Sequence, residues 1–231
     1  MGESLADLNA RPVRAVLTDF DRTLALLFDD AAMEDVRVDL ADFYTACSIP
    51  AYALHTANAY VLWINAYDWM IQHGWNDVEI IHQRATNLLS EHEYQAGEKS
   101  WLLSGVRSVL EWLEELAIPV AIVSTNATGA VELALKVNGV DRLVSVVLGR
   151  DDHRVNMGQL KPSPSLIHEA LEKVRGGPAL LVGDSINDIV AGQRAGVPTV
   201  GVTTGECSSE ELTAAGAAVV IPSFGELPSV M

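Results

Sequence analysis

The chain has 231 residues, and its 31 acidic against 15 basic side chains give a formal net charge of −16. This charge argues against nucleic acid and membranes as partners, because their negative surfaces repel an acidic protein. Cys47 and Cys207 lack metal-binding or redox spacing, so we expect a reducing, cytoplasmic compartment. No signal peptide is predicted in Met1–Arg14, which has no apolar core.

The first predicted element is the apolar run Ala15–Asp19, which is typical of a buried parallel strand. No strand pattern follows it until about residue 100. Three helices are predicted in this interval: Ala32–Cys47, Tyr52–His73 and Val78–Tyr94. The apolar stretch Ala51–Ile71 contains Asp68, which is costly at the centre of a bilayer, so we interpret it as part of a buried helix.

From about residue 102 to the end, strands and helices alternate. Further strands are predicted at Pro119–Ser124, Leu143–Leu148, Ala179–Gly183, Thr199–Val202 and Ala217–Ile221. Helices are predicted at Val106–Leu116, Ala127–Val137, Ser165–Val174 and Asp188–Ala195. The pattern predicts a doubly wound α/β fold with a parallel, Rossmann-like sheet. We expect a core domain of residues 1–27 and 101–231, and an inserted all-α domain of residues 28–100.

Polar side chains stand where the predicted strands end, which is where ligands bind in such sheets. These residues are Asp19, Asp21, Ser124, Thr125, Asn126, Asp184 and Asp188. An acid pair is also common in solvated turns, and a Ser-Thr-Asn run is also a common helix N-cap. Because carboxylates at the end of a buried strand are costly without a partner, the whole set favours a ligand site.

The residue types at these strand ends fit phosphoryl transfer. One carboxylate can act as nucleophile and a second as acid and base. The Ser124 hydroxyl and Lys161 can hold phosphate, although a lone lysine is more often simply on the surface. Asp184 and Asp188 supply the hard oxygen ligands that Mg²⁺ prefers.

The order and spacing of four motifs resemble the haloacid dehalogenase superfamily. They are D-x-D-x-T at residues 19–23, Ser124, Lys161-Pro162 and G-D-S-x-x-D at residues 183–188. The resemblance covers about residues 14–227 and is closest to the phosphoglycolate-phosphatase-like branch with a helical (C1) cap. It implies a Mg²⁺-dependent phosphatase that hydrolyses a small phosphorylated metabolite through an aspartyl-phosphate intermediate, as a monomer or homodimer.

The resemblance also implies individual roles. Asp19 matches the nucleophile, Asp21 the general acid and base, and Lys161 the cation between phosphate and nucleophile. The implied phosphate-binding residues are Ser124, Thr125, Asn126 and Lys161. The implied metal-binding residues are Asp19, Asp21 (through its backbone carbonyl), Asp184 and Asp188, the last supporting either the metal or the lysine.

Among the departures from the family pattern, two concern charged residues. Arg22 stands where many relatives have glycine, and we expect it to pair with an acidic residue of the cap rather than with substrate. The polar loop Gly149–Leu160 is longer than usual, and we expect its charged residues to be ordinary surface. These residues are Arg150, Asp151, Asp152, His153 and Arg154.

The nearest alternatives are a phosphomutase of the same superfamily and a catalytically silent binding protein. Relatives that are mutases often carry valine where this chain has Thr23, and a silent protein would have lost a motif acid. Dehalogenation is disfavoured because that branch lacks the carboxylate that Asp21 provides. Phosphonate cleavage would need a cap lysine, and the cap has only Lys99 at its edge.

The composition of the cap predicts a substrate with a neutral or aromatic leaving group. Residues 28–100 contain twelve acidic but only three basic residues, whereas a site for a second anion normally presents arginine. Most of the cap's aromatic rings should be core, with one or two lining a pocket. They are Tyr52, Tyr60, Trp63, Tyr67, Trp69 and Trp75. A sugar or nucleoside phosphate is therefore favoured over phosphoglycolate, unless arginines of the core domain read an anion.

Overall fold

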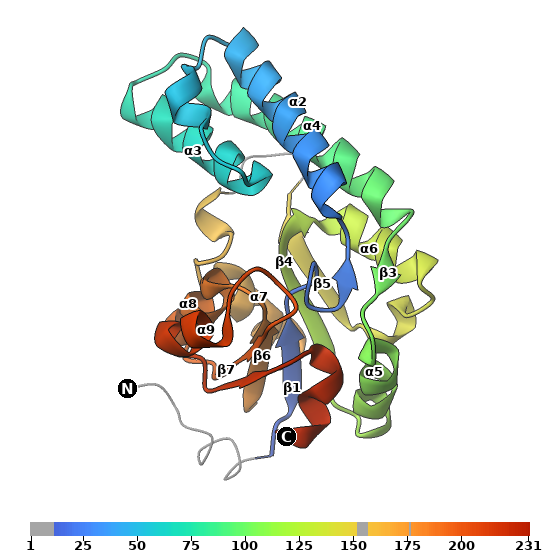
Figure 1. The fold of residues 1–231 in the computed structure, drawn as a ribbon. Coiled ribbons are helices and arrows are strands. Elements are labelled where there is room, and N and C mark those ends of the chain that lie inside the picture. Colours follow the sequence, from blue (N-terminus) through green and yellow to red (C-terminus); the bar gives the residue numbers. More distant parts are fainter. Residues whose placement is uncertain (1–11, 152–156, 176) are drawn as a thin grey trace.

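The computed structural model describes residues 12–151, 157–175 and 177–231. Its centre is a six-stranded parallel sheet in the order β5-β4-β1-β6-β7-β8 (Figure 1). The strands are β1 (Ala15–Thr18), β4 (Val120–Ala127), β5 (Val146–Arg150), β6 (Ala179–Gly183), β7 (Thr199–Val202) and β8 (Val219–Ile221). The four residues of β1 are all 0% exposed, because parallel neighbours flank this strand and helices cover both faces. The predicted doubly wound α/β fold is thus confirmed.

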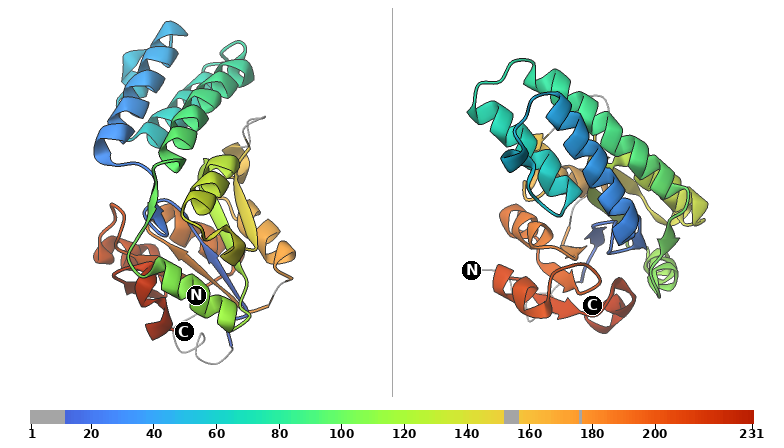
Figure 2. Two further views of the ribbon diagram at one scale, coloured as in Figure 1. Left: turned by 90° about the vertical axis from the view of Figure 1, so that its right-hand side faces the viewer. Right: turned by 45° about the horizontal axis from the view of Figure 1, so that its top comes forward.

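Helices cover both faces of the sheet, the earlier ones in the core sequence on one face and the later ones on the other. The helices of the core are α5 (Val106–Glu115), α6 (Thr128–Val137), α7 (Ser165–Lys173), α8 (Ile186–Ala195) and α9 (Ser209–Ala215). Figures 1 and 2 show α5 and α6 on one face and α7 to α9 on the other. The chain changes face when it turns back from β5 at the edge towards β6, because each crossover between parallel strands is right-handed.

Three long helices stand above the carboxyl ends of the strands (Figure 2). They are α2 (Asp30–Ala46), α3 (Ala59–Gln72) and α4 (Val78–Gly97). The single helix predicted over Tyr52–His73 is wrong in its first part, where a 3₁₀ turn over Ala51–Leu54 precedes an extended segment. The reason is Asn58, whose side chain accepts the backbone N–H groups of two following residues and so begins α3 at residue 59.

Two strands and one α-helix of the structure were not predicted. The segments that enter and leave the helical region form a short antiparallel pair, β2 (Ala25–Leu26) with β3 (Trp101–Leu102). Strands of two residues are too short to show an alternating pattern. Helix α9, in contrast, begins with a capping box between Ser208 and Glu211 that the sequence does display.

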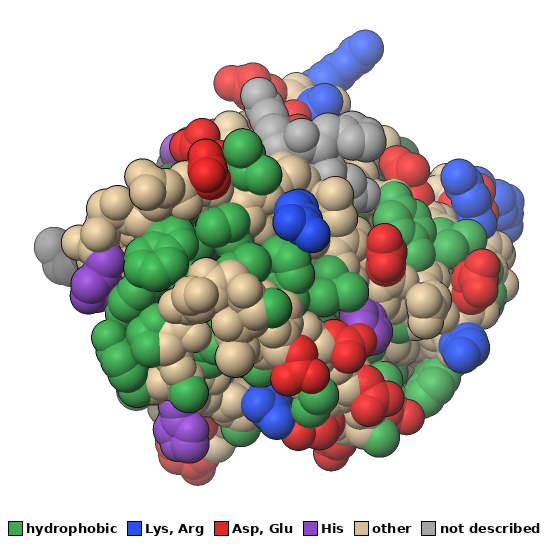
Figure 3. All heavy atoms as spheres, turned by 90° about the horizontal axis from the view of Figure 1, so that it is seen from above, with side chains coloured by type: hydrophobic (Ala, Val, Ile, Leu, Met, Phe, Trp, Pro, Cys, Tyr) green, Lys and Arg blue, Asp and Glu red, His purple; other side chains and the backbone are tan. Residues whose placement is uncertain are grey.

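The described part of the chain contains no helix long and apolar enough to span a membrane. Apolar side chains are nevertheless present on the outside of the helical region, where Tyr52 is 73% and Ile80 63% exposed. Figure 3 views this region from above and shows apolar side chains gathered on one part of the face and acidic side chains on another.

Candidate active site

Four charged side chains meet at the carboxyl edge of the sheet. Asp19 follows β1, Asp184 follows β6, Asp188 lies in the first turn of α8, and Lys161 precedes α7. Lys161 Nζ lies 2.5 Å from Asp19 Oδ1 and 2.6 Å from Asp188 Oδ1. One carboxylate oxygen from each of the three acids lies within 4.8 Å of the other two. Side chains more than 140 residues apart in sequence thus meet at one point. The positions of Asp19 and Asp184 at the ends of parallel strands predicted that these two acids would lie together.

Asp188 is fixed on both of its oxygens. Its Oδ2 accepts the backbone N–H of Ser185 at 3.0 Å and the Ser185 hydroxyl at 2.6 Å, which completes a capping box at the start of α8. Its Oδ1 holds Lys161. Asp188 therefore supports the lysine directly, while it also belongs to the group of three acids.

Burial disfavours the charged form of the acids at this site, and only one cationic side chain, Lys161, is bonded to them. Burial, together with the neighbouring carboxylates of Asp19 and Asp188, raises the pKa of Asp184 to about 9. Burial also raises the pKa of Asp19 to about 6, although Lys161 opposes this shift. Burial disfavours the charge of Lys161, but Asp188 and Asp19 raise its pKa above the usual lysine range. One ammonium group thus faces three carboxylates, and a divalent cation would supply the missing charge.

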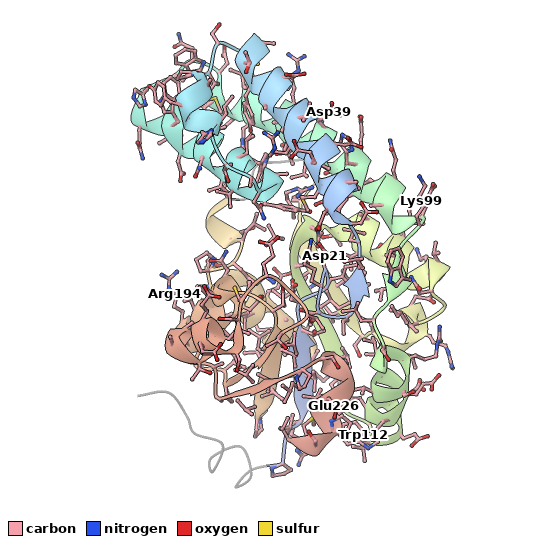
Figure 4. The ribbon with its side chains drawn as sticks, in the orientation of Figure 1. Asp21, Asp39, Lys99, Trp112, Arg194 and Glu226 are labelled. Carbon is pink, nitrogen blue, oxygen red and sulfur yellow. The ribbon has the colours of Figure 1, made fainter. Side chains whose placement is uncertain are left out.

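Asp21 lies between the end of the sheet and the helical region (Figure 4). Its Oδ1 accepts the backbone N–H of Leu27 at 2.7 Å. Burial raises the pKa of Asp21 to about 7, which suits a group that both gives and takes a proton near neutral pH. Two residues on, the hydroxyl of Thr23 is buried and donates to Asp184 Oδ1 at 3.4 Å.

Residues 124–127 form the end of strand β4 and do not provide a side-chain cap for α6. Helix α6 has Ala127 at its N-cap, with no side-chain hydrogen bond there. The Ser124 hydroxyl donates to Asn126 Oδ1 at 2.8 Å and accepts the backbone N–H of Asn126 at 3.1 Å. The register of β4 against β5 shifts between Val123 and Ala127, so the backbone bends away from the ladder at this point. We call residues 124–127 the phosphate loop, after the role that we propose for them.

A cavity of about 250 Å³ lies over these side chains. The core contributes the acid pair, the lysine and the phosphate loop, together with Glu206 and Cys207 from the segment after β7. The helical region contributes Met33, Asn58, Tyr60, Val61 and Ile64. None of the three basic residues of the helical region lines the cavity.

Gly205 brings the segment after β7 against Asp184. A Cβ atom at this position would overlap the Asp184 carboxylate, so only glycine allows this approach. This segment was not predicted to belong to the site.

Comparison with known families agrees with the geometry. A family model described as haloacid dehalogenase-like hydrolase matches residues 66–202, which is more than half of the chain. The chain belongs to the haloacid dehalogenase-like hydrolase family. This confirms the resemblance inferred from the motifs.

Similar proteins include phosphoglycolate phosphatases and a pyrophosphatase. A phosphoglycolate phosphatase from Yersinia pestis is 28% identical over 94% of this chain and 92% of its own length. A phosphoglycolate phosphatase from Photobacterium profundum is 31% identical over 65% of this chain and 66% of its own. The pyrophosphatase PpaX from Bacillus mycoides is 36% identical over 107 residues, about half of either protein.

Solved structures share the fold. A predicted phosphoglycolate phosphatase from Haemophilus somnus superposes with a TM-score of 0.65 at 23% identity, covering 94% of this chain and 97% of that one. CbbY from Rhodobacter sphaeroides, solved in complex with phosphate, gives a TM-score of 0.65 at 20% identity, covering 93% and 96%. Both likenesses concern the fold alone.

Arg22 behaves as expected for a residue in place of the family's glycine. Its φ angle of +59° lies in the left-handed region that glycine favours. Its Nη2 lies 3.4 Å from Asp30 Oδ1 at the start of α2, so the predicted pair with the helical region is present.

The expectation for Arg150 is wrong. Its side chain is only 1% exposed and forms an ion pair with Glu93 of α4, because β5 continues to residue 150 and turns this residue inwards. Asp151 is partly buried at the end of this strand. Asp152, His153 and Arg154 lie outside the described residues.

Sequence reasoning missed Glu93 beside the cavity and did not single out Tyr60. Glu93 is one of twelve acidic residues in the helical region, and nothing in its neighbours marks it as buried. Tyr60 was only one of six candidate rings. Its hydroxyl donates to Glu93 Oε1 at 2.7 Å and accepts from Asn126 Nδ2 at 2.6 Å, so it is one of the rings predicted to line a pocket.

Proposed function

We propose that this chain is a Mg²⁺-dependent phosphatase that hydrolyses a small phosphomonoester through a phosphorylated Asp19. The observation that carries the proposal is the placement of Asp19 and Asp21 at one strand end, with Lys161 on Asp19 and a cavity above. The names of the relatives support phosphate-ester chemistry. In this proposal residues 28–100 act as a cap domain over a core of residues 1–27 and 101–231.

The first step is attack of an Asp19 carboxylate oxygen on phosphorus, with departure of the ester oxygen. Asp21 donates a proton to that leaving oxygen, for which its raised pKa makes it available near pH 7. The phosphoryl oxygens are held by the Ser124 hydroxyl, with Thr125 and Asn126 beside it in the wall of the cavity.

The second step hydrolyses the aspartyl phosphate. Asp21, now a carboxylate, takes a proton from a water molecule, which attacks phosphorus and regenerates Asp19. Lys161 keeps its charge throughout, since its pKa is raised by Asp188 and Asp19, and it balances the phosphoryl charge next to Asp19.

The donor set fits magnesium. Three carboxylates in reach of one another offer hard oxygen atoms and an excess of negative charge. We assign the ion to Asp19, Asp184 and the backbone carbonyl of Asp21, with Asp188 in support through Lys161. When bound, Mg²⁺ would neutralise charge on the transferring phosphoryl group.

Asp19→Asn tests the proposal. The amide cannot attack phosphorus, so we expect a folded protein that releases no measurable inorganic phosphate from p-nitrophenyl phosphate. Asp42→Asn makes the same chemical change at an exposed position of α2 and should keep wild-type turnover. Retained activity in the first variant, or full wild-type activity after exhaustive chelation of divalent cations, would contradict the mechanism. Release of inorganic phosphate rather than an isomeric sugar phosphate separates a phosphatase from a phosphomutase.

A further inference from the structure

A buried ion pair joins the helical region to the core beside the proposed active site. Glu93 of α4 is 0% exposed, and Arg150 at the end of β5 is 1% exposed. Arg150 Nη2 lies 2.5 Å from Glu93 Oε2, and its Nη1 lies 3.1 Å from Glu93 Oε1. The guanidinium also donates to the Ser90 hydroxyl at 2.9 Å, and it lies over the ring of Trp63 at 5.4 Å from the ring centroid.

Among the described residues, three further side-chain bonds of this pair end on the phosphate loop. Glu93 Oε2 accepts the backbone N–H of Ala127 at 3.0 Å, and Glu93 Oε1 accepts Asn126 Nδ2 at 3.3 Å. Arg150 Nη1 donates to the backbone carbonyl of Thr125 at 3.2 Å. Three consecutive residues of the loop are therefore held by two side chains, one from the helical region and one from the core.

The contacts continue to the hydroxyl that faces phosphate in the proposed mechanism. Asn126, held by Glu93 and Tyr60, accepts the Ser124 hydroxyl at its Oδ1. The hydroxyl of Tyr60 bonds both Glu93 and Asn126, and Tyr60 itself lines the cavity. Burial and the nearby Glu93 raise the pKa of Tyr60 well above its usual value, so its hydroxyl keeps its proton.

Stability alone gives a weak reason for such a pair. Desolvation of two charges offsets most of their attraction, and apolar residues of similar volume often replace a buried pair at no cost in stability. The bonds of this pair, in contrast, fix a backbone carbonyl, a backbone N–H and an amide side chain of one loop in a single arrangement. Fixed geometry of this kind is what a phosphate-binding loop needs.

We propose that Glu93 and Arg150 are positioning residues, which hold the phosphate loop in the shape that binds the phosphoryl group and make that shape depend on the seated position of α4. The inference rests on the proposed function, since it assigns the loop to phosphate. Neither residue needs to touch substrate. Their effect reaches it through Thr125, Asn126 and the hydroxyl of Ser124.

Kinetics of Glu93→Gln and Arg150→Lys test the inference, with p-nitrophenyl phosphate as substrate and inorganic phosphate as competitive inhibitor. We expect KM and the inhibition constant of phosphate to rise together by about tenfold or more, which is the size of one lost charge-assisted hydrogen bond. The turnover number should change less, because the loop binds the phosphoryl group before and during the reaction. A variant that merely loosened the fold would lower the amount of active enzyme and leave both constants unchanged.

Two further variants test whether the effect comes from the loss of this particular ion pair. The alternatives are the loss of any carboxylate and an unpaired buried charge. Glu34→Gln removes a carboxylate from an ion pair on the exposed face of α2, and it should keep wild-type constants. The double variant Glu93→Leu with Arg150→Met leaves no unpaired buried charge, so it should fold even where a single variant does not. Raised constants in the folded double variant support the inference. Constants within twofold of wild type in that variant, or in a folded single variant, overturn it.

Failure of the inference can be told from failure of the proposed function. If wild-type protein neither hydrolyses the ester nor is inhibited by phosphate, the function is wrong. If wild-type protein does both and the folded Glu93 and Arg150 variants match it, only the positioning role is wrong.

Discussion

At the scale of single residues, Asp21 shows how burial prepares a side chain for its chemistry. The carboxyl group is largely removed from water, which raises its pKa to about 7, and the Leu27 N–H holds it in one orientation. Asp19, two residues away, is bonded to Lys161 instead. The same residue type thus acquires different partners at two positions within one turn of chain.

Asp21→Asn should separate the two steps of the proposed reaction. An amide cannot take the proton of water, so hydrolysis of the phosphoenzyme should slow by about 10²–10⁴-fold while an activated leaving group still departs. Incorporation of labelled phosphate into protein, followed by its release, measures both rates. Wild-type turnover of this variant on an alkyl phosphate would remove Asp21 from the acid and base role.

His82 is a buried histidine away from the site, and its environment keeps it neutral. Its ring stacks on Trp63 at 4.6 Å between centroids, and its Nδ1 lies 2.7 Å from the hydroxyl of Tyr44. Burial, with Arg150 nearby, lowers its pKa to about 3. In the unfolded chain the pKa returns to about 6.5, so the unfolded state binds the extra proton below that pH.

His82 should therefore make the protein less stable as the pH falls. Its contribution to the free energy of unfolding is complete above pH 6.5 and declines towards pH 3, by at most about 1.4 kcal/mol per pH unit. His82→Gln keeps an acceptor for Tyr44 but cannot bind the proton, so its unfolding free energy should fall less steeply. Urea unfolding at pH 7, 6 and 5 measures the difference, with exposed His73→Gln as control. Parallel curves for wild type and His82→Gln would contradict this.

At the scale of elements, the two segments that cross between the helical region and the core act as one unit. They lie near residues 25–28 and 97–103, and they contain the paired strands β2 and β3. Helix α4 also packs closely on α6, where a Cβ on Gly97 would meet the Ala130 carbonyl oxygen at 3.0 Å. Any closure over substrate must therefore bend this two-stranded connection and act against the α4 contacts.

We expect α2 and α3 to move towards the core when a phosphate analogue binds, because exclusion of water favours phosphoryl transfer. Spin labels at Ile71 of α3 and Glu114 of α5 would measure the distance between exposed sites, with both native cysteines replaced. The distance distribution should shorten with orthovanadate. A second pair within the core, Glu114 and Glu172, should not change. An unaltered distance distribution for the pair Ile71 and Glu114 would exclude the movement.

At the scale of the whole molecule, charge restricts the substrate. The helical region carries twelve of the acids and only three bases, and it offers the cavity Met33, Val61, Ile64 and the ring of Tyr60. Lys161 is already bonded to two carboxylates, and Arg22 pairs with an exposed aspartate. A leaving group with a ring or an apolar face finds partners here more readily than a carboxylate does.

A neutral sugar or nucleoside monophosphate should accordingly have a higher kcat/KM than phosphoglycolate, despite the names of the relatives. Arg22→Gly provides the control, because the positive φ angle at residue 22 suits glycine and the change removes a cation of the cavity wall that could read an anion. If wild-type protein prefers phosphoglycolate by tenfold or more, the charge argument is wrong. If that preference vanishes in Arg22→Gly, Arg22 reads the carboxylate.

The sequence by itself determined the sheet and the ends of most of its strands, although β4 and β5 continue to residues 127 and 150. Apolar runs of four to six residues, each followed by polar residues, mark parallel strands buried on both faces, and β6 and β7 begin and end where predicted. The carboxyl ends of parallel strands lie at one edge, so Asp19, Ser124 and Asp184 could be placed together without coordinates. These are local signals, repeated in order along the chain.

Only the tertiary structure decided which distant side chains contact one another. Arg150 looked like a residue of a polar loop, and Glu93 like one acid among many, because a charged residue has the same local pattern whether it meets solvent or a partner 57 residues away. The approach of Gly205 to Asp184 was equally invisible, since a glycine after a strand usually marks a simple turn. Burial of a charge is set by what packs over it, and that depends on how the helical region is seated on the sheet.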